Sequence, residues 1–395
     1  MKKFLLAVFL ISNVISSHEI INDTLQTTRQ DLDEVIVKGI RAKFSSPISF
    51  TNVDKQDLKS KNLGQDLPIL LNFLPSVVTT SDAGAGIGYT GIRIRGVSPQ
   101  STNITINGIP FNDPESMGTF WVNLPDFSSS IESLQVQRGV GTSTNGSSAF
   151  GASINILTEI VSDEPYAELS SSFGSYNTLK NTIKFSTGKI NDYFELSGRL
   201  SKIDSDGYVD RAYSDLKSYF IQGAYTNGST LIKAISFGGH EKTYQAWDGL
   251  SMDQVLENRR QNPLTYENEI DNYKQDHFQL HWNEKINNNW SFNLGLNYTD
   301  GRGYFEQYKE DDDINTYGGI VKSDIDSNGN ETGTTDLIRR RWLDNDFYVL
   351  NSSINYIKDK IDLTLSSSYS SYVGDHYGEV TVSYTHLTLP TSVIV

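Results

Sequence analysis

The sequence predicts an exported chain in which a small α+β domain precedes an antiparallel transmembrane β-barrel. Three observations support this fold class. The first residues have the pattern of a secretory signal, and residues 44–160 mix helical and strand periodicities. From Tyr166 onward, apolar and polar residues alternate over segments of about ten residues, as the lipid-facing strands of a barrel require.

Composition excludes several classes of protein. The 395 residues carry a net charge of −15, which argues against the basic surface that nucleic-acid binding needs. Because there is no cysteine, disulfides, thiolate metal sites and a lipid-modified cysteine are all impossible. The mean hydropathy is −0.40, and no apolar stretch after the N-terminus is long enough for a helical span. A barrel passes this test because only alternate residues of its strands face lipid.

Residues 1–17 are expected to be a signal peptide. Lys2 and Lys3 supply the positive region, residues 4–14 form the apolar region, and small residues at Ser16 and Ser17 suit cleavage. The alternative, a single membrane anchor, is disfavoured because the apolar run is too short to span a bilayer comfortably.

Residues 18–43 are expected to form a flexible leader that contains one β-prone island, residues 32–39. A short extended segment of this kind can add itself to the sheet edge of another protein. Pairing with the chain's own domain is an equally good interpretation of the spacing alone.

Residues 44–160 are expected to form the α+β domain. The spacing of leucines predicts a helix over residues 57–74 that Pro75 ends. Short strands are expected at residues 92–95, 103–106 and 134–138. The glycine-rich stretch 84–91 is interpreted as a turn, because it does not connect a strand to a helix and no P-loop lysine follows it.

Residues 161–382 are expected to form part of a barrel. Short turns alternate with three long loops, at 204–217, 242–274 and 301–345, after a short first hairpin. Outer-membrane barrels show this parity, with short periplasmic turns and long extracellular loops. We expect about nine strands, at 166–173, 178–187, 193–203, 218–226, 230–241, 275–284, 290–300, 346–357 and 361–373.

The domain at residues 44–160 resembles the plug of TonB-dependent outer-membrane receptors, and most of all the iron-complex receptors of Bacteroidetes. Four motifs carry the resemblance, in the order that the family has them. They are residues 66–77 with the LPGV-like turn (Ser76 replaces Gly), 92–96 with the RG segment, 104–110 with the DGVP-like turn (Asn107 replaces Asp), and 131–139 with 151–156 for the IEVLRGP and GGVINI block.

The resemblance implies an importer in the cell outer membrane, with the plug inside the barrel lumen. The family's barrels have 22 strands, so about nine strands imply an N-terminal fragment. Residues 383–395 break the alternation and are interpreted as a non-native tail. The implied partners are TonB, outer-membrane lipid, the barrel assembly machinery and an iron chelate or similar ligand, without nucleic acid.

The resemblance also implies roles for individual residues. The TonB box falls on Asp33, Glu34, Val35, Ile36 and Val37, in the periplasm, which makes partner pairing the expected role of this segment. Arg95 and Arg138 fall where plug arginines of the family pair with barrel carboxylates. The alternative for both arginines is solvated charge in the lumen.

The ligand is expected to contact aromatic residues on the plug apices and the barrel loops. A ferric siderophore is the first expectation, and cobalamin, haem or an oligosaccharide is the alternative. No catalytic constellation, metal site or cofactor is expected, and Asp311, Asp312 and Asp313 are interpreted as a solvated acidic loop in preference to a calcium site. A passive porin or a surface binding protein would not need the plug and the TonB box. The candidate contacts are Tyr89, Phe111, Phe120, Trp121, Tyr244 and Trp247, with Tyr304, Phe305 and Tyr308 as further loop aromatics.

Overall fold

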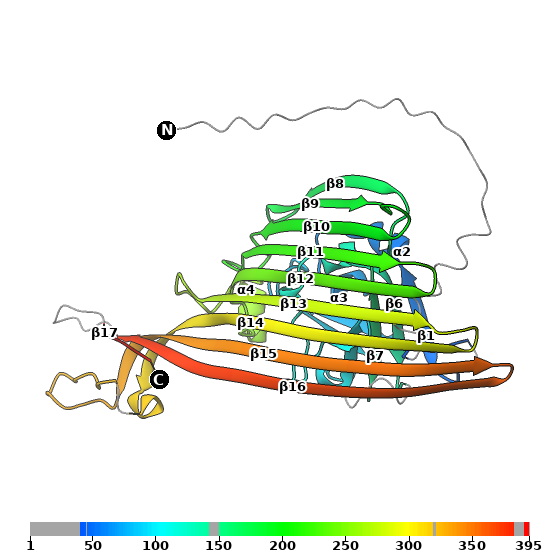
Figure 1. Cartoon of the computed structure of the whole chain (residues 1–395). Helices are drawn as coiled ribbons and strands as arrows, with labels where there is room; N and C mark the ends of the chain where they lie inside the picture. The colour runs from blue at the N-terminus through cyan, green and yellow to red at the C-terminus, as the bar shows by residue number, and fades with distance from the viewer. Residues whose placement is uncertain (1–39, 45, 142–149, 319–320, 383–390, 395) are drawn as a thin grey trace, which may run out of the picture.

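The computed structural model describes residues 40–44, 46–141, 150–318, 321–382 and 391–394. Within these ranges the chain forms an N-terminal α+β domain followed by one large antiparallel sheet (Figure 1). The predicted fold class is therefore confirmed. In the described ranges, no helix has the length and the hydropathy that crossing a membrane would require.

The N-terminal domain is built on a five-stranded sheet with the order β1-β6-β7-β4-β5. Strand β4 pairs with β7 in parallel, and the other neighbours are antiparallel. A separate hairpin joins β2 to β3. The bounds are β1 Ser49–Asp54, β2 Val77–Ser81, β3 Thr90–Ile94, β4 Thr102–Ile106, β5 Ile109–Pro110, β6 Ile131–Arg138 and β7 Ala152–Thr158.

The prediction of a single helix at residues 57–74 is wrong. The chain forms two short helices instead, α2 (Lys55–Lys59) and α3 (Leu67–Leu70). Gly64 between them has a φ of 127°, which a right-handed helix cannot contain. Pro68 could not continue such a helix either, because its ring would clash with the carbonyl group four residues earlier. The leucine spacing therefore marks a buried face, since Leu58, Leu67 and Leu70 all lie in the core.

Three 3₁₀ helices lie in the described part of the N-terminal domain, and another lies in a described sheet loop. The domain's core is apolar and contains residues of every strand from β1 to β7 except β5. The 3₁₀ helices are η1 Pro99–Ser101, η2 Trp121–Asn123, η3 Phe127–Ser130 and, in the loop, η5 Ile314–Tyr317.

The large sheet runs in strict sequence order from β8 to β17, and all nine expected strands are present as β8 to β16. The last strands are much longer than expected. The bounds are β8 Pro165–Gly174, β9 Thr178–Thr187, β10 Phe194–Ser205, β11 Ser214–Thr226, β12 Thr230–Tyr244, β13 Ile270–Lys285, β14 Trp290–Asp313, β15 Thr334–Lys358, β16 Ile361–Val382 and β17 Thr391–Ile394.

The three long loops, expected at 204–217, 242–274 and 301–345, are therefore shorter in the structure than predicted. The connections that remain are 206–213, 245–269, which contains helix α4 (Met252–Glu257), and 314–333. The ladder of β14 and β15 continues past the apolar alternation through pairs such as Tyr304 with Trp342. Main-chain hydrogen bonds need no apolar side chains, so the pattern of hydropathy ended before the strands did.

The register places apolar side chains on one face of the sheet and polar side chains on the other. One outward row joins Ile183, Leu200 and Tyr219 across β9, β10 and β11. Ile183 and Leu200 are more than half exposed, whereas the inward residues Lys180 and Arg199 are almost fully buried. An apolar outer face and a polar inner face are the pattern of a barrel strand in lipid.

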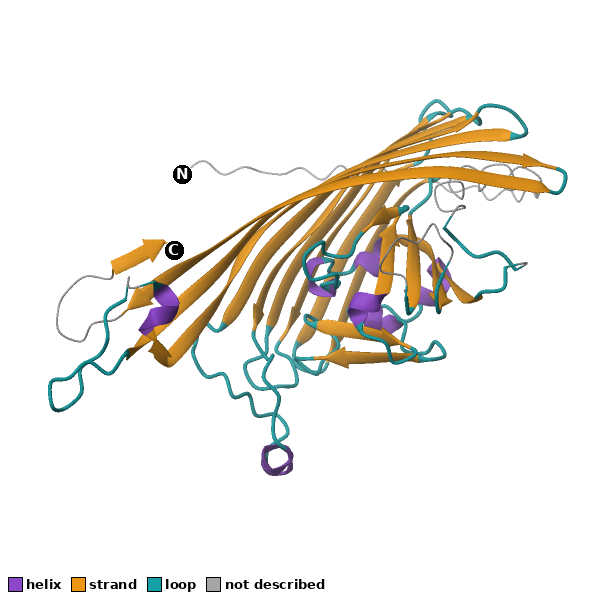
Figure 2. Ribbon diagram, turned by 90° about the horizontal axis from the view of Figure 1, so that it is seen from below, coloured by secondary structure: helices purple, strands orange, loops and turns teal. Residues whose placement is uncertain are grey.

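The N-terminal domain lies against the concave, inner face of the curved sheet (Figure 2). Close packing is clearest at Gly239 of β12, where an added Cβ would overlap the Asn123 carbonyl oxygen and lie 2.6 Å from Cδ of Pro125. Glycine is required here because two main chains approach each other directly.

The outer edge of β16 is unpaired over most of its described length. Strand β17 pairs only with Glu379–Val382, so the predicted open edge at residues 361–373 is present among the described residues. Residues 383–390 and 395 lie outside the described ranges, and the foreign origin of the tail stays a prediction.

Replacing Gly239 by Ala should weaken the docking of the N-terminal domain on β12. The added methyl group has no free space, and overpacking of this kind costs about 1–3 kcal/mol. Protease protection of the domain in purified protein would measure the effect. Gly223→Ala is the matched control, because nothing lies within 4 Å of its added Cβ. Equal protection of the two variants would contradict the close packing at Gly239.

Candidate functional site

A cavity of about 420 Å³ lies between the N-terminal domain and the inner face of the large sheet. Its volume is that of a site for a small ligand. It sits toward the end of the sheet that carries the long loops, because its sheet residues follow or precede those loops. Its lining includes Tyr89, Phe111, Asp113, Phe120 and Asn123 of the N-terminal domain, Glu241, Asp271, Tyr273, His277 and Phe305 of the sheet, and Trp247 of the connection between β12 and β13.

Asn112 holds the loop that carries Phe111 and Phe120. Its side-chain oxygen accepts a hydrogen bond from the Ile104 N–H at 2.7 Å, and its Nδ2 donates to the Thr102 and Met117 carbonyl oxygens at 2.9 and 3.0 Å. The loop is therefore tied to strand β4, and it presents its aromatic side chains to the cavity.

Tyr89 joins the two domains at the cavity wall. Its hydroxyl group donates a hydrogen bond to the Asp271 carboxylate of β13. Its ring meets Trp247 edge-on at 5.2 Å, and Trp247 meets Phe305 in the same way at 5.6 Å. Burial and the nearby carboxylates of Glu241 and Asp271 raise the pKa of Tyr89 well above its ordinary value. The hydroxyl group therefore stays protonated and can keep donating.

His277 of β13 lines the cavity with one nitrogen free to bind. Its Nδ1 lies 2.9 Å from the Thr299 hydroxyl, and its ring stacks on Phe237 at 4.6 Å. Nε2 of His277 and Oδ1 of Asn123 have no hydrogen-bond partner among the described residues. Buried polar groups are normally paired, so these two atoms can receive water or a ligand.

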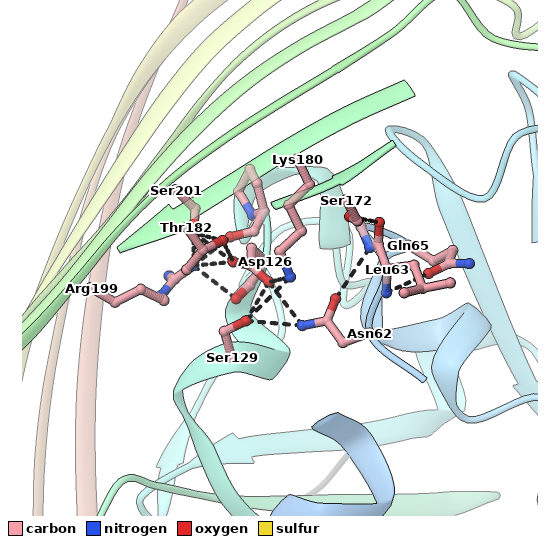
Figure 3. A network of polar contacts seen from close by, with 12 residues as sticks. Asn62, Leu63, Gln65, Asp126, Ser129, Ser172, Lys180, Thr182, Arg199 and Ser201 are labelled. Atoms are coloured by element: carbon pink, nitrogen blue, oxygen red, sulfur yellow. Dashed lines mark hydrogen bonds and ion pairs between the residues drawn. The ribbon is translucent and has the colours of Figure 1, made fainter. Parts of the chain in front are cut away.

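A buried ionic cluster attaches the N-terminal domain to the sheet (Figure 3). Asp126 has no exposed side-chain surface, and it pairs with Lys180 of β9 at 2.6 Å and with Arg199 of β10 at 3.3 Å. Its carboxylate also accepts hydrogen bonds from Thr182 and Ser201 of the sheet, and from Asn62 and Ser129 of its own domain.

Glu159 makes a second attachment close by. Its carboxylate pairs with Lys184 of β9 and, at 3.1 Å, with Lys55 of α2. Its main-chain carbonyl oxygen accepts a hydrogen bond from Lys233 of β12 at 2.9 Å. In the buried pairs that join the two parts, the N-terminal domain supplies the acids Asp126 and Glu159, and the sheet supplies Lys180, Lys184 and Arg199.

Comparison with protein families decides what the N-terminal domain is. Residues 42–153 match the family described as the TonB-dependent Receptor Plug Domain. The chain carries a TonB-dependent receptor plug domain. The match covers the domain that lies on the concave face of the sheet, and the predicted resemblance is confirmed. That the family member is of the Bacteroidetes type, and that the chain is an N-terminal fragment, stay predictions.

Curated relatives agree with this assignment. The chain is 28% identical over 187 residues to the vitamin B12 transporter BtuB of Vibrio vulnificus, covering 47% of this chain and 28% of the relative. It is 24% identical over 193 residues to the ferrienterobactin receptor of Escherichia coli, covering 45% of this chain and 26% of the relative. The matched part therefore spans about a quarter of each relative.

Solved structures share the fold. The ferric preacinetobactin receptor BauA of Acinetobacter baumannii superposes with a TM-score of 0.63 at 12% identity, covering 89% of this chain and 52% of that one. The ferric-catecholate import receptor Fiu of E. coli gives a TM-score of 0.60 at 15% identity, covering 87% and 51%. The protein is an outer-membrane β-barrel protein, and the described sheet corresponds to part of its barrel.

The structure brings four of the six candidate ligand contacts together. Tyr89, Phe111, Phe120 and Trp247 line the cavity between plug and barrel. Ligand binding by these residues stays a prediction.

The other two candidates do not line this cavity. Trp121 is 3% exposed and belongs to the plug core, although it also borders a second cavity of about 260 Å³. The hydroxyl group of Tyr244 donates to the carbonyl oxygens of Leu264 and Tyr266, so this side chain braces its own loop. Neither role could be read from residue type, because both aromatic rings are buried by segments distant in sequence.

Sequence reasoning missed the residues that β13 contributes. Asp271, Tyr273 and His277 lie on the inward face of β13. The first two fall in residues 270–274, which were expected to be loop, whereas His277 falls in the strand expected at residues 275–284. The apolar alternation does not continue backward from Phe278, because Asn272, Lys274 and Asp276 occupy the outward positions.

The acidic run at residues 311–313 takes part in local structure. Asp312 accepts a hydrogen bond from the Tyr317 hydroxyl, and Asp313 accepts one from the Asn315 N–H. None of the three residues lines the cavity.

Arg95 and Arg138 lie near each other on the plug. Arg138 donates to the Pro75 carbonyl oxygen at 3.0 Å and to the Thr51 hydroxyl at 2.8 Å, and both partners belong to the plug. Burial and the positive charge of Arg95 lower the pKa of Arg138. Pairing of the two arginines with barrel carboxylates is not seen in the described part of the chain and stays a prediction. The buried pairs that are seen have the opposite polarity, with acids on the plug.

The predicted TonB box, Asp33 to Val37, lies outside the described residues. The described chain begins at Ile40, and Arg41 beside it already contacts the plug through Ser133 and the Asn155 carbonyl oxygen. The leader therefore enters the plug at strands β6 and β7.

Replacing Asp126 by Asn should loosen the plug in the barrel. The change keeps the volume but leaves Lys180 and Arg199 buried without their anion, and breaking a buried pair costs about 3–5 kcal/mol. Guanidinium unfolding of the purified protein, followed by protease accessibility of the plug, would measure the loss. Asp375→Asn is the control, because that aspartate is exposed on β16. A midpoint shift as small as that of the control would argue against Asp126 as the residue that attaches the plug to the barrel.

The pH dependence of the same variant gives a second readout. Burial alone would raise the pKa of Asp126, but Arg199 and Lys180 lower it below its ordinary value. A carboxylate whose folded pKa is lowered stabilises the protein at neutral pH, and this contribution is lost as the pH falls through the folded pKa. We therefore expect the parent to lose plug stability in acid more steeply than Asp126→Asn.

Proposed function

We propose that the protein imports a scarce ligand, most of all a ferric siderophore, across the outer membrane with energy supplied through TonB. One observation carries the proposal: an aromatic cavity lies between a plug domain and the inner wall of a barrel. A plug that fills the lumen and contacts the ligand can couple binding on one side to release on the other. A passive porin would have no use for the plug, and we propose no catalytic step.

TonB would act through the leader. A β-strand at the end of a tether is a suitable handle, because the main-chain hydrogen bonds of a strand pair resist pulling. Residues 33–37 precede the point where Arg41 contacts the plug, so a pull on them would reach β6 and β7 first.

The charge of the cavity supports a narrower ligand class. Its described lining contains three acids, Asp113, Glu241 and Asp271, and no Lys or Arg. Arg341 lies beside the cavity, with its guanidinium 5.5 Å from the Phe305 ring centre. This wall favours a neutral or cationic chelate, such as a ferric trihydroxamate, over a trianionic ferric tricatecholate. Some similar proteins are named for catecholate ligands, and we propose a different ligand class for this protein.

Cobalamin is the second candidate. Its specific support is the aromatic part of the cavity lining, together with the similarity to vitamin B12 transporters. Haem and oligosaccharides are the remaining alternatives, and no described residue pattern favours them.

Replacing Val35 by Pro should abolish uptake while ligand binding persists. Proline removes a main-chain donor from the predicted TonB strand and leaves the cavity untouched. Cells that produce the variant are given radioactive iron in their own culture supernatant. Measuring iron uptake and iron binding to the intact cells separately would distinguish loss of transport from loss of ligand binding. Thr27→Pro, in the same leader but outside the predicted box, is the matched control. Undiminished uptake by Val35→Pro would refute coupling through this segment.

The chelate preference is tested by growth under iron limitation. The difference in growth between a parent strain and its deletion strain should be large when the iron source is a ferric trihydroxamate, or when growth depends on cobalamin. The difference should be smaller when the iron source is a ferric tricatecholate. Each unit of like charge at about 8 Å costs roughly 2 kcal/mol at an effective dielectric of about 20. Asp113→Asn, which removes one acid of the cavity lining, should narrow the difference in growth between the chelates. A receptor that serves the tricatecholate best would overturn the assignment of the ligand class.

A further inference from the structure

The inner wall of the barrel changes its chemistry between β12 and β13. On β9, β10 and β12, four basic side chains point toward the plug, and each is 8% exposed or less. They bind the plug segment 125–130 and Glu159 through the ion pairs described above and through carbonyl oxygens, including that of Ser129. The four residues are Lys180, Lys184, Arg199 and Lys233.

Between His277 and the short turns, the wall of β13 to β15 that faces the plug is uncharged, whereas Asp271 of β13 borders the cavity itself and binds Tyr89. The inward column of β13 continues from His277 through Gln279 and His281 to Asn283, opposite hydroxyl, amide or glycine residues of β14. Among the described residues, only single neutral hydrogen bonds reach the plug in this stretch. Nδ2 of Asn107 donates to Gln279 at 3.1 Å, and Nδ2 of Asn351 donates to the Gly108 carbonyl oxygen at 2.8 Å.

Two ion pairs also join the plug side to β16, but both are solvent-exposed. Lys43 pairs with Asp362 and Glu115 with His376, and each side chain is 44–50% exposed. Exposed pairs of this kind contribute little, because water screens them. Asp362 lies at the start of β16 and His376 in its second half, and neither lies on β13 to β15, so these pairs do not replace the missing charges of that wall.

Unpartnered buried atoms of the described sheet strands are more frequent from β13 onward. Four lie on β13 and β14 and four on β15 and β16, whereas two lie on β10 and β11, at Ser197 and Gln222. Buried polar atoms without a protein partner call for water or a ligand. The four on β13 and β14 are His277 Nε2, Asn283 Nδ2, Asn293 Oδ1 and Asn297 Oδ1.

The ligand cavity opens directly onto this wall. His277 lines the cavity, and Gln279, the next inward residue of β13, contacts Asn107 of the plug. A column of neutral polar side chains therefore leads from the cavity toward the short-turn end of the barrel.

We infer that the passage for the ligand opens between the plug and strands β13–β15, while the plug stays attached to β9–β12. This inference rests on the proposed import function. Amide hydrogen bonds can be exchanged for hydrogen bonds to water at little net cost, whereas breaking the buried ion pairs would leave charges stranded. A pull on the plug therefore separates the neutral seam, defined as the contacts of Asn107 and Gly108 with β13 and β15, before it releases the anchor at Asp126 and Glu159.

Thiol labelling tests which side opens, and the natural absence of cysteine makes the experiment clean. Gln279→Cys reports on the seam, and Ser218→Cys reports on the anchor, because Ser218 donates to the Pro125 carbonyl oxygen at 2.6 Å. A membrane-impermeant maleimide is added to intact cells, energised or uncoupled. We expect labelling of Gln279→Cys to be about tenfold faster in energised cells, as when an open state rises from about 1% to about 10%. Labelling of Ser218→Cys should not change. Equal acceleration at both sites, acceleration at Ser218 alone, or none at either would overturn the inference.

Reversible tethers give a second and independent test. The pair Asn107→Cys with Gln279→Cys closes the seam, and the pair Pro125→Cys with Ser218→Cys closes the anchor, each through a bifunctional methanethiosulfonate. Closing the seam should abolish uptake of radioactive iron from the culture supernatant, and reduction should restore it in the same protein. Closing the anchor should leave uptake as it was. Loss of uptake with both tethers would show that the plug moves as a whole and would refute the inference.

The two tests separate this inference from the proposed function. If Val35→Pro left uptake unchanged, import through TonB would fail, while the maleimide experiment would still report which side of the plug opens. If Val35→Pro abolished uptake but the anchor tether also blocked it, the function would stand and the route would fail.

Discussion

The burial of Asp126 among Lys180 and Arg199 is the constraint on which the arrangement of the protein depends. The carboxylate satisfies two cations that the inner wall could not otherwise bury, and hydrogen bonds from Thr182 and Ser201 complete its shell. Removing charges from water is costly, so the cluster specifies the docking position more than it adds to net stability. With this point fixed, strands β11 and β12 meet the plug core through Phe220, Ile235 and Phe237.

The docking position in turn creates the ligand cavity. The plug loop that carries Phe111 and Phe120 is held by Asn112, and it faces β13 only because the anchor sets the plug against β9–β12. The two sides of the plug therefore have different properties. One is closed by buried charge, and the other combines an aromatic cavity with a neutral polar wall. An importer needs both, since a plug that is held everywhere cannot open and a plug that is held nowhere cannot transmit a pull.

The candidate site was predicted from sequence only in part. Tyr89 and Phe111 were found because plug motifs place them on apical loops, and Trp247 was found because it lies in a loop between strands. Trp121 and Tyr244 have the same residue types in similar places, yet the core buries the first and loop carbonyl groups bind the second. Asp271 was missed because the first residues of β13 follow main-chain pairing, which hydropathy does not report. His277 lies in the strand predicted at residues 275–284, but no local pattern shows that Phe111 of the plug packs against it.

The sequence by itself determined the barrel alternation, the number and order of strands β8 to β16, and the plug, because the period of two and the plug motifs are local patterns. It did not determine the break between α2 and α3, where Gly64 and Pro68 override leucine spacing. Only the tertiary structure decided which charges meet. Arg199 is 73 residues from Asp126, and no local pattern relates two residues that become neighbours only when the domain docks on the sheet. The polarity of the buried pairs, with acid on the plug and base on the barrel, is for that reason a property of the assembled fold.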